Sequence, residues 1–383
     1  MKKWIVLAVS SAAFCLVGLF FCISMILQGA VLPFGDGASQ AEASASAAES
    51  TESMNADSAV SSSADAPAIP GITAEQAALL PQNPADFSRS VWAVDWDEDS
   101  AKTYLDAHQD GISEVSIFAA TFNSAGQISE PDALTALMTD LKAAYPDKKY
   151  YLSVTNDIIE DGWTEAKNSN ILYTLLEDEG SARAHAQQLA ALASEQGFDG
   201  VEIDYESIYG DTTLWNLVIR FEDMLAEEAG SRGLGVRVVL EPSIPADQLN
   251  FSDRVEHVVM CYDAHGIGTD AGPRADFDFL SGIVSNFSRV PNLSYAIANG
   301  GYDWNLGGGY TEPCSDRDVA KIMGTYGGEP VRDESNGALL YSYTDEAGSA
   351  HQLWYGDEET LRIWQTQIEN QVGHPVSVCI WRA

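Results

Sequence analysis

Eight short apolar runs, most of them separated by helix-like segments, constrain the fold of this chain more than any other feature. The runs are VWAVDW (91–96), EVSIFAATF (114–122), KYYLSVT (149–155), FDGVEIDYE (198–206), GVRVVLEP (235–242), HVVMCYD (257–263), LSYAIA (293–298) and VSVCIW (376–381). Eight alternating β and α units in about 295 residues match the size and rhythm of a (β/α)8 TIM barrel, an α/β fold. A doubly wound open sheet is the alternative fold.

The chain between the seventh and eighth runs is longer than one connection requires. It includes ALLYSYTDEAGSAHQLWYG (338–356), in which two strand-like halves flank residues 345–348. Turn-forming residues between two strand-like halves are typical of a β-hairpin. We therefore expect a small α+β insertion between strands 7 and 8, at about 301–357.

The fourth run carries three carboxylates at alternate positions. A strand has a side-chain period of two, so Glu202, Asp204 and Glu206 share one face. A half-buried strand with its acids in water would also explain this pattern. Helix-like runs at 182–196 and 214–229 flank the strand, however, and this favours a parallel unit whose outer face is covered by helices. In a closed barrel the acids would face the interior, where like charges are costly unless they share protons or bind a ligand.

This acidic strand resembles the fourth-strand signature D-G-x-D-x-D-x-E of glycoside hydrolase family 18, the chitinase-like family. Asp199, Gly200, Asp204 and Glu206 match the signature, and Glu202 stands where the chitinases usually have Asp. Further stretches agree in order: MCYDAHG (260–266), GGYDWN (300–305), HQLWYGDEETL (351–361) and IWR (380–382). Two of them, GGYDWN and HQLWYGDEETL, are similar to the family's bacterial cell-wall branch, which includes spore-cortex and germination hydrolases. The resemblance spans about residues 89–383.

The resemblance implies a substrate-assisted reaction. Most glycosidases use a second carboxylate, but in this family the substrate's own 2-acetamido carbonyl attacks the anomeric carbon. Glu206 would be the general acid at the C-terminal end of its strand, where parallel barrels gather their active-site groups. Asp204 would orient the acetamido N–H, and Glu202 would belong to the proton-sharing network. Closely spaced carboxylates raise each other's pKa, so one of them can stay protonated as the acid.

The resemblance also implies residues that bind the sugar. Tyr262 would hydrogen-bond the acetamido group, Asp263 would help to hold the sugar, and Trp381 would form an apolar floor under it. Ordinary core packing is the alternative for Trp381. Tyr302 and Trp304 are expected to line the cleft, and a turn anchored by aromatic residues is the alternative for them.

Composition excludes several other functions. The chain has 20 Lys and Arg against 57 Asp and Glu, a net charge of −37, which argues against a nucleic-acid partner. Neither H-E-x-x-H nor C-x-x-C occurs, and there is no P-loop, so we expect neither a metal nor a cofactor. Binding of Ca²⁺ or Mg²⁺ by the acidic strand is a weaker alternative, because one strand supplies few converging ligands.

We therefore expect a glycosidase whose partner is a polysaccharide containing β-linked N-acetylglucosamine, either peptidoglycan or a chitin-like polymer. The competing interpretation is a non-catalytic, lectin-like carbohydrate-binding module on the same barrel. The presence of Glu206 favours the enzyme, because a lectin has no need of a general acid.

The N-terminus predicts a membrane anchor. Residues 4–27 are 24 uncharged residues, long enough to span a bilayer and longer than the apolar region of a usual secretory signal. No Lys or Arg lies between Lys3 and Arg89, so the positive-inside rule puts the following chain outside the cytoplasm. A secreted protein with a cleaved signal is the alternative. The expected parts are an anchor (1–35), a disordered Ser/Ala/acidic linker (36–88) and an extracytoplasmic catalytic barrel at the cell membrane (89–383).

Overall fold

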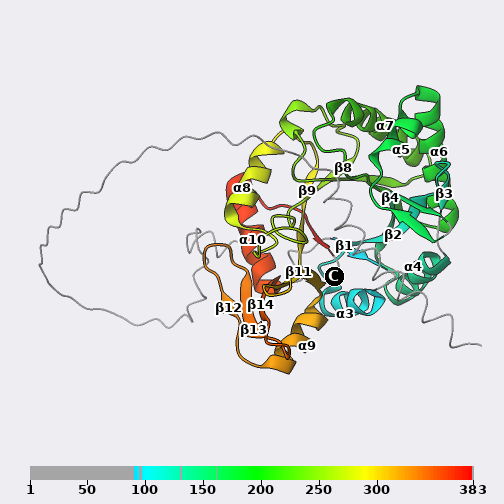
Figure 1. Cartoon of the computed structure of the whole chain (residues 1–383). Helices are drawn as coiled ribbons and strands as arrows, with labels where there is room; N and C mark the ends of the chain where they lie inside the picture. Colours follow the sequence, from blue (N-terminus) through cyan, green and yellow to red (C-terminus); the bar gives the residue numbers. More distant parts are fainter. Residues whose placement is uncertain (1–89, 95–96, 130–131, 161, 382–383) are drawn as a thin grey trace, which may run out of the picture. The chain divides into compact units, whose positions relative to one another are not determined.

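The computed structural model describes residues 90–94, 97–129, 132–160 and 162–381, and its central feature is a closed parallel barrel (Figure 1). The barrel strands, in spatial order, are β1 (Ser90–Ala93), β2 (Glu114–Phe122), β4 (Lys149–Glu160), β6 (Gly200–Asp204), β7 (Gly235–Leu240), β8 (Glu256–Met260), β9 (Leu293–Ala298) and β15 (Val378–Trp381). Strand β1 pairs in parallel with both β2 and β15, so the sheet closes on itself. The predicted (β/α)8 barrel is confirmed, and the open sheet is excluded.

Helices cover the outer face of the barrel, because strands buried on both faces need an apolar layer on each side. These helices are α3 (Glu98–His108), α4 (Asp132–Ala144), α5 (Ser169–Leu176), α6 (Glu179–Gln196), α7 (Thr212–Gly230), α8 (Phe277–Asn286) and α10 (Glu358–Val372). The connection from β7 to β8 contains instead a single 3-10 turn, Ala246–Gln248. The outward-facing Val201 and Ile203 of β6 are fully buried in the layer between strands and helices.

The helices on either side of β6 begin and end where their capping residues dictate. The side chain of Asp178 accepts hydrogen bonds from the first turn of α6, and Asp211 does the same for α7. Helix α6 ends at Gly197, whose φ of 80° is a left-handed conformation that glycine adopts without strain. These caps set the lengths of the connections before and after β6. They therefore help to position the carboxylates that β6 carries.

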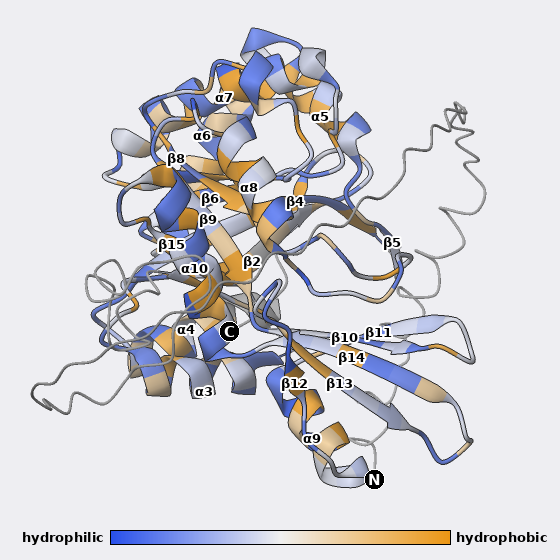
Figure 2. Ribbon diagram, turned by 90° about the vertical axis from the view of Figure 1, so that its left-hand side faces the viewer, coloured by the Kyte–Doolittle hydropathy of each residue, from blue (hydrophilic) through white to orange (hydrophobic). Residues whose placement is uncertain are grey.

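The expected insertion lies between β9 and β15. It contains β10 (Gly300–Asn305), β11 (Tyr310–Cys314), α9 (Asp316–Tyr326), β12 (Val331–Arg332), β13 (Leu339–Thr344) and β14 (Ala350–Gly356). The five strands form an antiparallel sheet, with β13 and β14 joined as the predicted hairpin (Figure 2). Val319 of α9 packs with Tyr341 and Leu353 in a small core of its own. Two further short strands, β3 (Ile128–Ser129) and β5 (Trp163–Glu165), pair with extended ends of β2 and β4.

The expected anchor (1–35) and linker (36–88) lie outside the described residues. Within residues 90–381, as far as the structure describes them, no helix is both long enough and apolar enough to cross a membrane.

Candidate active site

Glu206 lies two residues beyond the end of β6, at the C-terminal mouth of the barrel. Its backbone is held by Asn156 of the neighbouring β4: the N–H of Glu206 donates to Oδ1 of Asn156 at 2.9 Å, and Nδ2 of Asn156 donates to the Glu206 carbonyl at 2.9 Å. Asn156 is fully buried, so this pair of bonds extends the ladder past the strand end. The next residue, Ser207, has a φ of 60° and turns the chain away. The Glu206 side chain is therefore presented from a fixed backbone.

Lys167 forms an ion pair with Glu206. Its ammonium donates a hydrogen bond to Oε1 of Glu206, and its backbone N–H donates to Oδ1 of Asp157 at 2.7 Å. Burial opposes the positive charge, but the carboxylates of Glu206 and Asp204 outweigh it and raise the pKa of Lys167 above its ordinary value. The lysine comes from the loop between β5 and α5, where no sequence pattern had indicated a site residue.

Asp204 is a buried carboxyl with an unused oxygen. The residue is 5% exposed, and its Oδ1 has no hydrogen-bond partner among the described residues. Burial raises the pKa of Asp204 well above its ordinary value, the charge of Glu206 raises it further, and Lys167 opposes the rise. A buried carboxylate without a donor is costly, so the neutral, protonated form is favoured here.

Burial also raises the pKa of Glu206, and the charges of Glu241 and Asp263 add to that rise, while Lys167 opposes it. The Glu206 side chain is 13% exposed and can reach solvent at the mouth. Burial therefore favours a proton on Asp204, whereas the ion pair favours the charged form of Glu206. One of two adjacent carboxyls here favours its protonated form and the other its charged form. Such a pair can exchange one proton when a ligand changes the relative pKa values of the two groups.

Glu202 lies deepest of the three acids and is completely buried. Its Oε1 accepts from the indole N–H of Trp92 at 2.6 Å, and its Oε2 accepts from the Ser116 hydroxyl at 2.8 Å. Nε of Arg237 lies 3.5 Å from Oε2. Donors on β1 and β2 and the charge of Arg237 on β7 therefore hold this carboxylate, and a shared proton with Asp204 stays a prediction.

Trp381 and Tyr262 stack on each other at the end of the barrel, and the predicted roles of Trp381 as a floor under the sugar and of Tyr262 as a donor to the acetamido group stay predictions. Their rings are nearly parallel, 6.1 Å apart at an interplanar angle of 7°. Trp92 meets Trp381 edge-on at 5.8 Å, and Phe118 lies 5.3 Å from it. Trp381 is only partly buried and packs against the inner cluster of buried residues in the barrel. Burial and the neighbouring acids raise the pKa of Tyr262 well above its ordinary value, which keeps its hydroxyl protonated as a donor.

Tyr302 and Trp304 extend from β10 of the insertion toward the loop that follows β8. Their rings lie 5.7 Å apart. The indole N–H of Trp304 donates to the Thr269 carbonyl at 3.2 Å, and the residue is 5% exposed, so Trp304 ties the insertion to that loop. Tyr302 is half-buried, and the guanidinium of Arg274 lies over its ring. A sugar contact for either residue stays a prediction.

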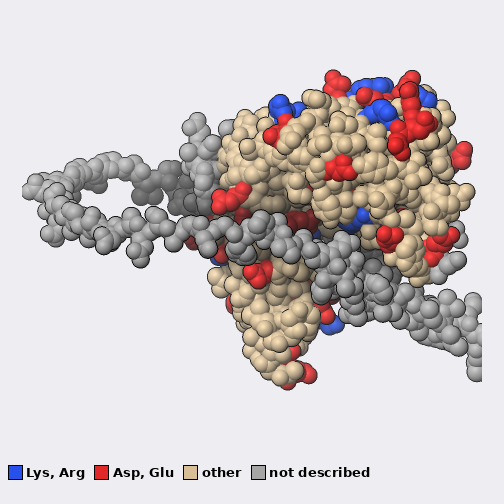
Figure 3. Space-filling view, turned by 45° about the horizontal axis from the view of Figure 1, so that its top comes forward, with Lys and Arg blue, Asp and Glu red and all other residues tan. Residues whose placement is uncertain are grey.

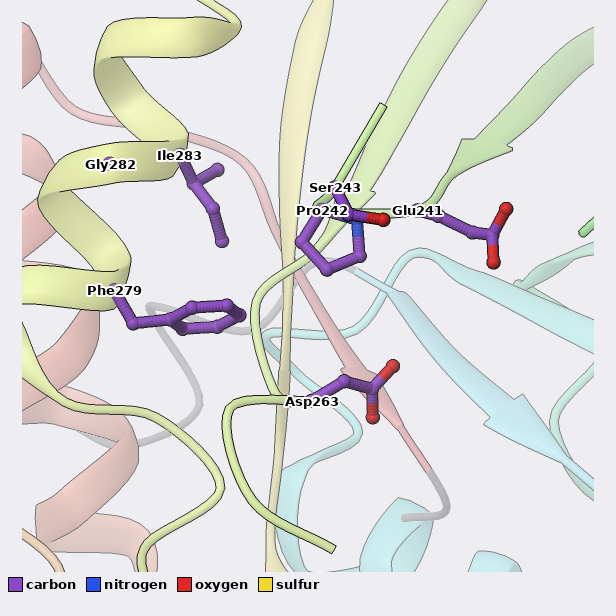
Figure 4. A pocket seen from close by; sticks show the side chains of 7 residues that line it. All are labelled: Glu241, Pro242, Ser243, Asp263, Phe279, Gly282 and Ile283. Atoms are coloured by element: carbon purple, nitrogen blue, oxygen red, sulfur yellow. The ribbon is translucent and has the colours of Figure 1, made fainter. Parts of the chain in front are cut away.

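A hollow of about 420 Å³ lies between the end of β7 and α8 (Figure 4). Its lining residues are Glu241, Pro242, Ser243, Asp263, Phe279, Gly282 and Ile283. Figure 4 shows the carboxyls of Glu241 and Asp263 pointing to the same side, away from α8. Asp263, predicted to hold the sugar, is thus joined by Glu241, which sequence reasoning missed. Burial raises the pKa of Glu241, and the backbone amides of residues 207–209 oppose the rise.

Comparisons with known proteins agree with this architecture. No protein-family model matches the sequence, and no curated protein sequence matches it. Among solved structures, the Chromobacterium violaceum chitinase has a TM-score of 0.63 at 18% identity, covering 76% of this chain and 93% of that one. The Bacillus cereus spore cortex-lytic enzyme SleL has a TM-score of 0.62 at 17% identity, covering 77% and 71%. A class V chitinase of Nicotiana tobaccum, solved in complex with NAG4, has a TM-score of 0.57 at 16% identity, covering 76% and 92%.

These likenesses concern the fold, because the identities are low. The chain has the fold of chitinases and of spore cortex-lytic enzymes, which is the family resemblance that the motifs of the sequence predicted. The fold is that of a glycoside hydrolase, and the chemistry has to be argued from the site itself.

Proposed function

We propose that this protein is a glycosidase that cleaves β-linked glycans containing N-acetylglucosamine, with retention of configuration and with help from the substrate's acetamido group. The observation that carries this proposal is Asp204: one of its carboxyl oxygens is buried beside the expected acid Glu206 and has no donor among the described residues. The N–H of a 2-acetamido group would supply that donor. The chitinase and cortex-lytic neighbours, one of them bound to NAG4, support the same substrate class.

The reaction proceeds in two steps. In the first, Glu206 gives its proton to the glycosidic oxygen, that oxygen leaves the anomeric carbon, and the acetamido carbonyl oxygen bonds to the same carbon. In the second, water attacks the anomeric carbon from the face that the leaving group vacated, the carbonyl oxygen departs, and Glu206 takes the proton of the water. Two inversions at one carbon give net retention. The internal nucleophile is already positioned by binding, which lowers the entropic part of the barrier.

Asp204 and Lys167 prepare the acid for this reaction. In the free protein, burial favours a proton on Asp204, and Lys167 favours the charged form of Glu206. An ionised Asp204 accepts the acetamido N–H more strongly than a neutral one does, so substrate binding favours transfer of its proton to Glu206. The resulting Asp204 carboxylate then stabilises the positive charge that develops on the acetamido group. Tyr262 and Trp381 complete the site as a hydroxyl donor and an apolar floor.

The competing function is carbohydrate binding without hydrolysis, on the same barrel. Three features favour catalysis: the expected acid at the mouth, the raised pKa of the neighbouring Asp204, and the ion pair between Lys167 and Glu206. A lectin would need none of them, because binding a neutral sugar does not require a proton to be moved.

The decisive experiment follows the anomeric configuration of the first-formed product by proton NMR, with chitotetraose as substrate. We expect the β-anomer to appear first and to equilibrate slowly with the α-anomer. A glucose tetrasaccharide without acetamido groups should not be cleaved. Appearance of the α-anomer first, or equal cleavage of the glucose analogue, would refute the mechanism. Binding of chitotetraose with no cleavage at any pH would support the lectin-like alternative.

We also propose that residues 1–35 anchor the protein in the cell membrane, with the barrel outside the cytoplasm. The uncharged segment 4–27 and the lack of basic residues between Lys3 and Arg89 support this arrangement. Protease added to intact cells stripped of their wall should remove the barrel from a membrane-bound remnant. Full protection of the barrel, or its recovery in the medium without the N-terminal segment, would contradict the anchor.

A further inference from the structure

Arg274 lies at the mouth of the barrel, in the loop between β8 and α8. Its guanidinium carbon lies 5.1 Å from the ring centre of Tyr262 and 5.3 Å from that of Tyr302, two residues predicted to contact the sugar. The Arg274 carbonyl accepts a hydrogen bond from the N–H of Ala264 at 3.0 Å, which closes the loop. The cation–π contacts and the closed loop therefore hold the guanidinium in one place.

The guanidinium of Arg274 has no hydrogen-bond acceptor among the residues that the structure describes. The residue is 8% exposed, and its Nε–H is buried without a partner. Desolvation raises the pKa of Asp263 and the charge of Arg274 opposes this rise, so the two groups interact across space without forming an ion pair. Nε of Arg237, deeper in the barrel, also lacks a hydrogen-bond partner within the described part of the chain, but that guanidinium donates to Ser90 and forms an ion pair with Glu202. A buried guanidinium without an acceptor is costly, so an acceptor supplied by a ligand would be strongly favoured.

We propose that Arg274 binds a carboxylate of the substrate, so that the substrate is an N-acetylglucosamine-containing glycan whose sugars carry carboxylates. The lactyl ether of N-acetylmuramic acid has this chemistry in peptidoglycan strands whose stem peptides have been removed, because in a strand that keeps its stem peptides this carboxyl is an amide. The inference rests on the proposed glycosidase function and narrows its substrate class.

The geometry at Arg274 favours a carboxylate over a neutral group. The contacts with the two ring faces use the charge of the guanidinium and leave its N–H donors free. Its planar fork matches the two oxygens of a carboxylate, which can accept two parallel hydrogen bonds. A sugar hydroxyl would accept from one N–H and leave the positive charge uncompensated.

The negative charge at the mouth explains why binding of a substrate carboxylate would need an arginine there. The acids that face the site are Asp204, Glu206, Glu241 and Asp263, and acidic side chains are also spread over the outer surface (Figure 3). A carboxylate entering this mouth is repelled unless a cation offsets the acids. Lys167 is already paired with Glu206, whereas Arg274 forms no ion pair with any of the described residues. Arg274 is therefore the cation available to an acidic substituent.

The test compares two forms of one glycan. Peptidoglycan strands freed of their stem peptides carry free lactyl carboxylates, and coupling to methylamine turns these into neutral amides without changing the sugars. We expect the wild-type protein to cleave the free strands roughly 10- to 100-fold more efficiently, by kcat/KM, as expected for a bidentate charge-assisted pair. Arg274→Gln should bring this ratio to within about threefold of unity, and Arg274→Lys should give an intermediate ratio because it keeps the charge without the fork.

The ratio is measured within one preparation, so a loss of folded protein affects both substrates equally and cancels. Arg254→Gln is the matched control, because Arg254 is exposed in the loop before β8, at the opposite end of the strand, and it should keep the wild-type ratio. An unchanged ratio in Arg274→Gln would overturn the inference. Equal cleavage of both strands by the wild-type protein, alongside good cleavage of chitotetraose, would overturn the inference and leave the glycosidase function standing. Failure to cleave the strands and chitotetraose alike would overturn both proposals.

Discussion

Lys167 donates a hydrogen bond to Oε1 of Glu206, so the expected general acid is held in an ion pair when no substrate is bound. This ion pair opposes the protonation of Glu206 that the reaction requires. A general acid has to carry a proton, yet a neighbouring ammonium favours the ionised carboxylate. Burial and the nearby acids raise the pKa of Glu206, and Lys167 lowers it. The net pKa stays above its ordinary value, so Lys167 limits the rise without abolishing it.

Replacing Lys167 should therefore move the pH profile of the reaction. Lys167→Met keeps much of the side-chain volume and removes the charge, so the pKa of Glu206 should rise further. The acid then stays protonated to higher pH, and the alkaline limb of kcat/KM on chitotetraose should shift to higher pH. The measurement is a pH profile of kcat/KM for the wild-type protein, for Lys167→Met and for Lys102→Met, a control at an ion pair on α3. An unshifted limb, or one shifted to lower pH, would show that Lys167 does not act on the acid.

The sequence predicted the fold and the acidic strand because both follow from periodic patterns. Eight apolar runs defined the barrel strands, and the period of two put Glu202 and Asp204 on the inner face while Ile203 faced the helices. Lys167 and Arg274 could not be found in this way. They lie in loops without periodicity, and only the closure of the barrel brings them to the site.

Two missed residues did carry a signal. Asn156 directly follows the run 149–155, and Glu241 lies near the end of the run 235–242, so both are polar groups at the C-terminal ends of apolar strand-like runs. The rule that pointed to Glu206 applies equally to these positions. Glu206 itself lies beyond the regular strand, which ends at Asp204, and the positive φ of Ser207 turns the chain away directly after it. Strand ends are set by such local conformations, which apolar patterning does not encode.

Substitution of the acid itself should abolish most of the activity. Glu206→Gln keeps an acceptor for Lys167 and the backbone bonds to Asn156, so the protein should stay folded. Loss of a positioned general acid should lower kcat by about 10²- to 10⁴-fold. The rate on chitotetraose, together with the melting temperature, tests this. Glu160→Gln, at an exposed end of β4, is the control. A rate within a few fold of wild type in Glu206→Gln would remove Glu206 from its assigned role.

Asp204 should show a conflict between stability and activity. The pKa of Asp204 in the folded protein is raised above its ordinary value of 3.8. Below pH 3.8 the protonated Asp204 therefore contributes its full stabilisation, and this stabilisation is lost as the pH rises through the folded-state pKa. Asp204→Asn cannot ionise and escapes this loss. The melting temperature of the variant minus that of the wild type should therefore become more positive between pH 5 and pH 8, while the rate falls at both. Asp99→Asn, at an exposed carboxylate, should leave the difference constant. A difference for Asp204→Asn that is flat or falls with pH would contradict the buried, protonated state.

Arg237 lies inside the barrel below the site and neutralises several buried acids. Its Nε lies 3.5 Å from Glu202, its NH1 lies 3.9 Å from Glu114, and its NH2 donates to the Ser90 hydroxyl at 3.0 Å. The arginine and Glu202 are register partners on the adjacent strands β7 and β6. Removing one member of such a pair leaves the other as an uncompensated buried charge.

Arg237→Met should therefore lower the free energy of unfolding by about 3–5 kcal/mol, whereas Glu202→Gln in the same background should recover part of that loss. The reason is that the double variant removes the stranded carboxylate as well as its cation. Urea denaturation of the wild type, both single variants and the double variant gives the coupling energy between the two residues. Arg254→Met, at an exposed position, is the control and should change stability by less than about 1 kcal/mol. If the losses in unfolding free energy of the two single variants simply add in the double variant, the coupling energy is zero. Arg237 then does not stabilise the buried carboxylate of Glu202.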